Sequence, residues 1–199
     1  MDNAKIHLSQ RELELVNNTE WILTKRLIIE KITDYFGGLH EEMKIIMGNL
    51  SIVDQKEFKS NGKISKGENY KGLPYLILDY PGIFEKENMF AIRTMFWWGY
   101  FFSITLHVTG HFKKKLQSTS QLVNFLISKD FYICTNEEEW EHHFEMENYT
   151  LAKDLDNLLE TIASKSFLKI SKKLPISDWQ NSKTFLLKNF TDLLEIMSN

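Results

Sequence analysis

The sequence predicts a single α+β domain in which a mainly antiparallel sheet packs against helices from both ends of the chain. Strand-like runs separated by turn signals fill residues 73–109, and amphipathic helical patterns lie before and after them. A length of 199 residues with 43% hydrophobic content suffices for one core, and no repeat or low-complexity linker divides the chain. The predicted segments are a helical N-terminal arm at 9–48, a mobile basic loop at 49–72, the sheet at 73–109 and a mixed helical C-terminal half at 116–199.

The N-terminal arm begins with a capping box, because Ser9 is followed three residues later by Glu12. Residues 17–19 (Asn-Asn-Thr) prefer helix caps to helix interiors, so they predict a break. Residues 37–38 (Gly-Gly) predict a second interruption. We expect the arm to pack on the apolar face of the sheet through residues at helical spacing: Leu13, Val16, Ile22, Leu23, Leu27, Ile28, Ile32, Tyr35 and Phe36.

The segment 49–72 has little regular pattern and is rich in glycine and lysine. A phosphate-binding loop needs a Ser or Thr after its lysine and a glycine five residues earlier, and Gly62-Lys63-Ile64 meets neither requirement. The segment is therefore predicted to be a basic surface loop.

The central sheet is predicted from three runs. Residues 73–80 end at Pro81-Gly82, and residues 89–97 and 100–109 are separated by a turn that contains Gly99. Because only two or three residues remain for that turn, the last two runs should form a tight antiparallel hairpin.

Two registers fit the hairpin. A two-residue turn pairs Trp97 with Tyr100, whereas a three-residue turn pairs Phe96 with Tyr100. The second is preferred because it gives one coherent apolar face, and because glycine suits the left-handed position that closes such a loop. The apolar face then holds Phe90, Ile92, Phe96, Phe102, Ile104, Leu106 and Val108. The other, mixed face holds Ala91, Arg93, Met95, Phe101, Ser103, Thr105, His107 and Thr109.

Two short strands are predicted near 131–135 and 167–173. The second alternates lysines with apolar residues, a pattern typical of an edge strand that resists further pairing. Helical spacing between Leu151 and Ile162, and again in the last twenty or so residues, predicts two further helices.

Composition limits the classes of function. A net charge of −3 and a pI near 6.1 argue against bulk attraction to nucleic acid. The single cysteine, Cys134, excludes an internal disulfide and suits a reducing compartment. With no secretory signal, and with Met95–Val108 too short to span a bilayer as a helix, we expect a cytoplasmic protein that does not enter membranes.

Catalytic and cofactor motifs are missing from the sequence. Neither Gly-X-Ser-X-Gly nor Gly-X-Gly-X-X-Gly occurs, and nothing singles out a pair of carboxylates for acid–base chemistry. Cys134 lies in a short apolar run where a buried, inert thiol is expected. No catalytic residue and no cofactor are therefore predicted, and whether the protein is an enzyme is left open, with the balance against it.

The acidic stretch 137–147 contains six glutamates and two histidines, which makes it a candidate metal site. On a helix, Glu138 or Glu139 would share a face with His142. A carboxylate-bridged dimetal bundle needs a second Glu-X-X-His copy, and none occurs. His107 and His111 would lie about 13 Å apart along a strand, too far to bind one ion. The prediction is a solvated acidic helix and no metal site.

The main candidate binding site is on the mixed face, where Asp79, Arg93, Ser103, Thr105 and His107 are expected close together. Three interpretations are open: a solvated face, an Arg93–Asp79 ion pair beneath a covering helix, or a pocket in which Arg93 binds a small anionic ligand beside a titratable His107. The function predicted first is binding of such an anion.

Two alternatives use the aromatic side chains of the hairpin. Trp97 and Trp98 at its tip would suit a protein-interaction module or a homodimer. With Tyr100, Phe101 and nearby lysines they would also suit stacking of single-stranded nucleic acid, although the acidic net charge argues against that use. Both alternatives depend on exposure of the two tryptophans.

Overall fold

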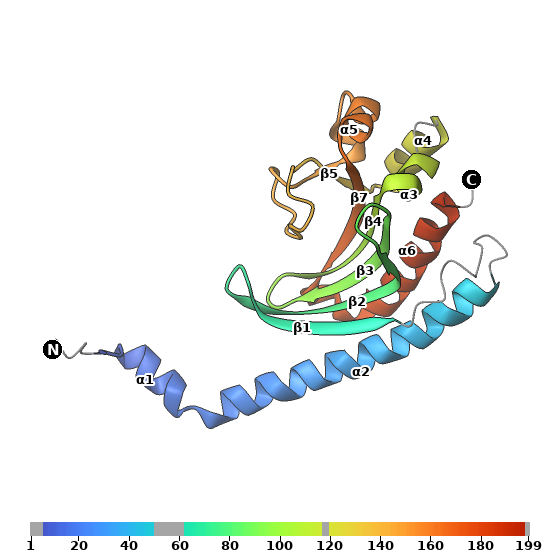
Figure 1. The fold of residues 1–199 in the computed structure, drawn as a ribbon. Coiled ribbons are helices and arrows are strands. Elements are labelled where there is room, and N and C mark those ends of the chain that lie inside the picture. Colours follow the sequence, from blue (N-terminus) through green and yellow to red (C-terminus); the bar gives the residue numbers. More distant parts are fainter. Residues whose placement is uncertain (1–5, 50–61, 117–119, 198–199) are drawn as a thin grey trace.

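The computed structural model describes residues 6–49, 62–116 and 120–197. Its centre is a curved antiparallel sheet of seven strands in the order β1-β2-β3-β4-β7-β5-β6, which confirms the predicted α+β class (Figure 1). The strands are β1 (Lys63–Tyr70), β2 (Leu73–Phe84), β3 (Met89–Trp97), β4 (Phe101–Thr109), β5 (Tyr132–Cys134), β6 (Tyr149–Leu151) and β7 (Phe167–Pro175). The α-helices are α1 (Gln10–Asn17), α2 (Thr19–Asn49), α3 (Gly110–Lys115), α4 (Ser120–Ser128), α5 (Leu158–Ser164) and α6 (Ser182–Ile196), with short 3-10 helices at Ala152–Asp154 and Ile176–Asn181.

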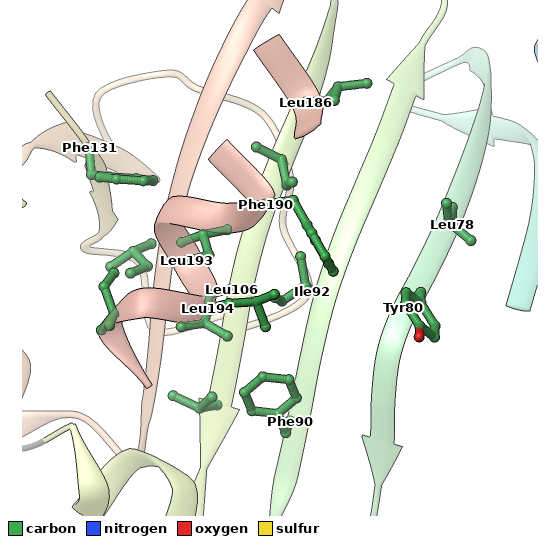
Figure 2. Packing of buried hydrophobic residues seen from close by; sticks show 14 of the residues in the cluster. Leu78, Tyr80, Phe90, Ile92, Leu106, Phe131, Leu186, Phe190, Leu193 and Leu194 are labelled. Carbon is green, nitrogen blue, oxygen red and sulfur yellow. The ribbon is translucent and has the colours of Figure 1, made fainter. Parts of the chain in front are cut away.

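The main core lies between the apolar face of the sheet and the helices α2 and α6. Figure 2 shows Phe190, Leu193 and Leu194 of α6 beside Ile92 and Leu106 of the sheet. From Ile29 onward, α2 covers the same face with Ile29, Ile32, Phe36, Leu39, Met43 and Met47. The helices α3, α4 and α5 contribute Phe112, Leu126 and Ile162 to the same core.

The capping box and the break near residue 18 are confirmed. Ser9 accepts a hydrogen bond from the backbone of Glu12, and α1 ends at Asn17 with Asn18 as its C-cap. The second predicted interruption was wrong, because α2 continues as one helix of 31 residues through Gly37 and Gly38. Phe36 and Leu39 on either side of the glycines are buried in the core, and this packing offsets the poor helix propensity of glycine.

The predicted hairpin register was wrong, because the three-residue loop begins one residue later than expected. The predicted faces are nevertheless correct. The loop is Trp98-Gly99-Tyr100, so that Trp97 pairs with Phe101 and Phe96 with Phe102. Trp97 stays in the strand because its indole Nε1 donates to the backbone oxygen of Tyr70 at 3.2 Å and its ring stacks on Tyr100 at 3.9 Å. The pairing shift equals two residues, and side chains alternate with a period of two, so each residue keeps its face. Gly99 adopts the expected positive φ of 78°.

Part of the predicted basic loop forms a strand. Residues 63–70 pair with β2 as the edge strand β1, with a register shift between Gly67 and Tyr70. Residues 50–61 of that prediction lie outside the described part of the chain. The strand carries few apolar residues, and its position is set by pairing with β2, so its own sequence gave little signal.

Two predictions for the C-terminal half also need correction. The strand near 167–173 is β7, and it is an interior strand between β4 and β5, not an edge. The acidic stretch is not a helix but an irregular connection between β5 and β6. In place of the helix expected from Leu151, β6 and a 3-10 turn precede α5, which begins only at Leu158.

Candidate functional site

A buried ion pair lies at the centre of the mixed face. Asp79 on β2 and Arg93 on β3 are direct neighbours across the sheet. Nε of Arg93 donates to Oδ1 of Asp79 at 2.7 Å, and Nη2 donates to Oδ2 at 3.0 Å. The two side chains are 13% and 7% exposed, so this two-point contact is largely removed from water. The geometry is that of the ion-pair interpretation, with a loop in place of the expected covering helix.

The covering segment is the connection from β5 to β6, residues 135–148, which we call the acidic loop. In Figure 1 it is the orange segment on the side of the sheet opposite α6. Its His142 places Nε2 3.3 Å from Nη1 of Arg93. Lys169 of β7 donates from Nζ to the backbone oxygens of Glu139 and Glu141, at 2.7 Å and 2.6 Å. These contacts fix the loop on the face that was expected to hold a ligand.

Tyr70, at the end of β1, holds the same loop from the other side. Its hydroxyl donates to the Glu141 carboxylate at 2.8 Å and accepts from the backbone amides of His142 and His143 at 2.7 Å and 3.0 Å. Burial raises the pKa of Tyr70, so the phenol keeps its proton and remains a donor. The edge strand therefore contributes directly to the position of the acidic loop.

His107 is neutral in the folded protein. Burial, reinforced by the positive charges of Lys169 and Arg93, lowers the pKa of His107 to about 2. The Glu139 carboxylate, 3.1 Å from Nε2, acts in the opposite direction, but its side chain is 34% exposed and its field is therefore screened. A neutral ring beside a carboxylate must carry its proton on Nε2, which donates to Glu139.

The stability of the fold is expected to fall as the pH drops below about 6.5, the unfolded pKa of histidine. His107 stays neutral when folded but binds a proton when unfolded, and burial lowers the pKa of His142 as well. Between the folded and unfolded pKa of His107, the free energy of unfolding should decrease by up to about 1.4 kcal/mol per pH unit for this one proton. Urea unfolding at pH 7, 6 and 5 measures this slope. His107→Gln should reduce it, whereas replacement of the exposed His111 should not, and a flat profile would contradict the burial of neutral His107.

Lys169 is the second unusual titratable group of the face. It is 1% exposed, and burial, with Arg93 nearby, lowers the pKa of Lys169 to about 8. Two backbone carbonyls accept its hydrogen bonds, so it serves as a fixed donor to the acidic loop. Sequence reasoning missed it because it was placed on an edge strand. The alternation of Phe167, Lys169 and Ser171 could have assigned it to this face once β7 was paired with β4.

The five residues predicted for the site do share one face, but they do not surround an open pocket. All three available nitrogen positions of Arg93 have contacts, two with Asp79 and one with His142. Thr105 contacts Ser171, with 2.6 Å between the hydroxyl oxygens, and Ser103 is buried opposite Met95. A depression of about 200 Å³ lies at the end of the face, where Glu139, Trp140, Met89 and Thr109 are among the lining residues.

The metal candidates were placed on a helix that does not form. Glu139 contacts His107, and His142 contacts Arg93, so the expected Glu–His pairs are separated by other partners. The residues of the loop that could hold an ion are instead His143, Glu145 and Glu147, whose ligand atoms lie within 4.8 Å of one another. His143 is already in contact with Glu141 and Glu145.

The hairpin tip presents only one of its two tryptophans. Trp97 is 3% exposed and belongs to a small core with Ile77, Met95 and Phe101. Trp98 is partly buried, and its ring meets the edge of Trp21 from α2 with 6.3 Å between the centroids. Because Trp97 is buried, it is not available for the protein-interaction or nucleic-acid-stacking alternatives. Trp98 contacts Trp21 of α2.

Beside Trp98, the N-terminal helical segment carries nine of the eighteen large apolar side chains that are exposed on the described chain. From here on, the name arm is used for residues 6–28 alone and no longer for the whole segment 9–48. This shorter arm comprises α1 and the first turns of α2, which point away from the sheet in Figure 1. Every residue from 6 to 24 is exposed, and α1 has no buried residue. The exposed large apolar side chains of the arm are Ile6, Leu8, Leu13, Leu15, Val16, Trp21, Ile22, Leu23 and Leu27. The sequence pattern assigned most of them to the core of the domain.

Comparison with protein-family models, curated proteins and solved structures finds no match for this chain. Among the described residues, no helix is both long enough and apolar enough to cross a membrane.

Proposed function

We propose that this chain is a protein-interaction module that binds an apolar helical surface of its partner through the arm. The observation that carries the proposal is the continuous exposure of residues 6–24 in a segment rich in large apolar side chains. Monomeric proteins seldom expose many large apolar side chains in one segment, and large exposed apolar surfaces commonly mark association sites.

The length of α1 supports the same conclusion. The helix has eight residues and no buried side chain. Helices shorter than about 12–15 residues are marginal in water without packing, and the capping box at Ser9 contributes only about 1 kcal/mol. A stable α1 therefore needs a surface to pack on, and the described part of the chain offers none.

The exposed residues also have the spacing of a helical contact surface. Leu13 and Val16 are three residues apart in α1, and Leu23 and Leu27 are four apart in α2, so each pair lies on one side of its helix. Helical stripes of this kind dock on apolar stripes of other helices.

Binding of a small anion at Arg93, the function predicted first from the sequence, has weaker support. A ligand would have to replace Asp79 or His142 and lift an acidic loop held by Lys169 and Tyr70. Glutamates of that loop would also repel an anion.

The expected result of disrupting the arm is loss of the complex. In native extract of cells that produce the chain, wild type should elute in gel filtration above its monomer mass of 23.5 kDa. Leu23→Glu with Leu27→Glu should shift it to the monomer position, because two charges then lie in the apolar contact. Ile45→Glu, at a residue 64% exposed near the other end of α2, is the matched control and should elute like wild type. Monomeric elution of the wild type would contradict the proposal.

A further inference from the structure

The charges of the arm and of the next three residues of α2, 29–31, are divided into two blocks of opposite sign. Residues 10–20 hold Glu12, Glu14 and Glu20 against Arg11, whereas residues 24–31 hold Lys25, Arg26 and Lys31 against Glu30. The first block is thus acidic and the second equally basic. A pair of consecutive helices with these charges is complementary to its own copy in the reversed direction and repels a copy in the same direction.

We infer that the partner is a second copy of this chain, and that the two arms pack antiparallel about a two-fold axis near Ile22. This inference rests on the proposed function of the arm. The midpoints of the two blocks lie on either side of Ile22, so an axis there sets the acidic block of each copy beside the basic block of the other. A two-fold axis also uses the same surface on both copies, which is the commonest way in which identical chains associate.

The basic block keeps charge available for such a contact. Lys25 already pairs with Glu68 of β1 at 2.5 Å, on the side of α2 that faces the sheet. Arg26 is exposed, and neither Arg26 nor Lys31 forms an ion pair with another described residue. These two residues can therefore meet Glu12, Glu14 or Glu20 of the second copy without breaking a contact inside either chain.

Apolar packing would supply most of the stability, and the charges would set the direction. In the antiparallel arrangement Val16 of one copy lies near Leu27 of the other. Both are among the most exposed apolar residues of the arm, at 70% and 56%. The arm bends at Asn18, so its two helical segments, residues 10–17 and 19–28, span roughly 12 Å and 15 Å at 1.5 Å per residue, two to three turns each. Pairing would also give α1 the surface that it lacks within its own chain.

Disulfide trapping of purified full-length chain tests the direction. One preparation carries Val16→Cys, a second carries Leu27→Cys and a distinguishing tag, and the mixture is oxidised mildly. Antiparallel arms bring the two positions within disulfide range, about 4.4–6.8 Å between Cα atoms, so the mixed disulfide should exceed both same-position disulfides. The native Cys134 is buried and stays unreacted, and Val16→Cys mixed with Ile45→Cys is the control that should give no cross-link.

Each outcome decides between the inference and the function on which it rests. An excess of Val16–Val16 and Leu27–Leu27 disulfides would mean parallel arms and would overturn the inference, with the interaction function intact. A particle of twice the 23.5 kDa mass by sedimentation, but no arm cross-link, would place the dimer contact elsewhere and would also overturn it.

A monomer by sedimentation would exclude the second copy. In that case an arm-dependent complex in extract would leave a different protein as the partner, and its absence would end both proposals.

Discussion

Replacing Arg93 with alanine is expected to lower the free energy of unfolding by about 3–5 kcal/mol, the usual cost of breaking a buried ion pair by removing one partner. The variant leaves Asp79, 7% exposed, as a buried carboxylate without its two charged hydrogen bonds. It also removes the contact with His142, so the acidic loop loses one anchor. For a chain of this size the thermal midpoint should fall by roughly 10 °C.

Two comparisons make this result specific. Lys153→Ala removes a pair with Asp130 at the same 2.7 Å distance, but the two side chains are 48% and 62% exposed, so the loss should stay below about 1 kcal/mol. Replacing both buried partners, by Asp79→Leu with Arg93→Met, should recover much of the stability lost in Arg93→Ala, because no uncompensated charge remains. A loss under about 1 kcal/mol for Arg93→Ala would contradict the structural role of the pair.

The same variant separates a structural from a ligand-binding role. If a small organic acid raises the thermal midpoint of the wild type but not of Arg93→Ala, then Arg93 binds that acid and the acidic loop must open to admit it. Equal responses of the two proteins, together with the large loss of stability, assign Arg93 to the fold.

The sheet and its faces could be predicted because strand alternation needs no knowledge of the partner strand. Phe96 and Phe102 share the apolar face in the structure as the alternation requires. The register could not be fixed in this way, since a shift of two residues keeps every side chain on the same face. The observed register depends on Trp97, which bonds to the backbone of Tyr70, a residue in a segment predicted to be a loop.

The position of the acidic loop over the mixed face was not predicted, for a related reason. Six glutamates between residues 137 and 147 suggested a solvated helix, and local pattern gives no sign of a remote anchor. The anchors are Lys169 of β7 and Tyr70 of β1, which follow or precede the loop by many residues. Tertiary contacts of this kind override local propensity. The five residues were therefore assigned to one face correctly, whereas the acidic loop that covers them was not predicted.

The arm shows a third limit. Apolar residues at helical spacing are required equally by a domain core and by a surface that binds another chain. Sequence therefore assigned Leu23 and Leu27 to the same role as Ile32 and Phe36. The structure separates them, because Ile32 and Phe36 are fully buried against the sheet whereas Leu23 and Leu27 are about half exposed.

Hydrogen exchange of the arm amides, measured on purified chain over a range of concentrations, tests the central claim most directly. In dilute solution α1 should exchange nearly as fast as an unfolded peptide, because a lone helix of eight residues is marginal. At concentrations where the arms pair, amides of residues 10–24 should slow by about tenfold or more, equivalent to at least about 1.4 kcal/mol of added protection. Amides of α6, which packs in the core at every concentration, provide the internal reference. Leu23→Glu with Leu27→Glu should abolish the concentration dependence, and fast exchange of α1 in wild type at every concentration would contradict arm pairing between copies.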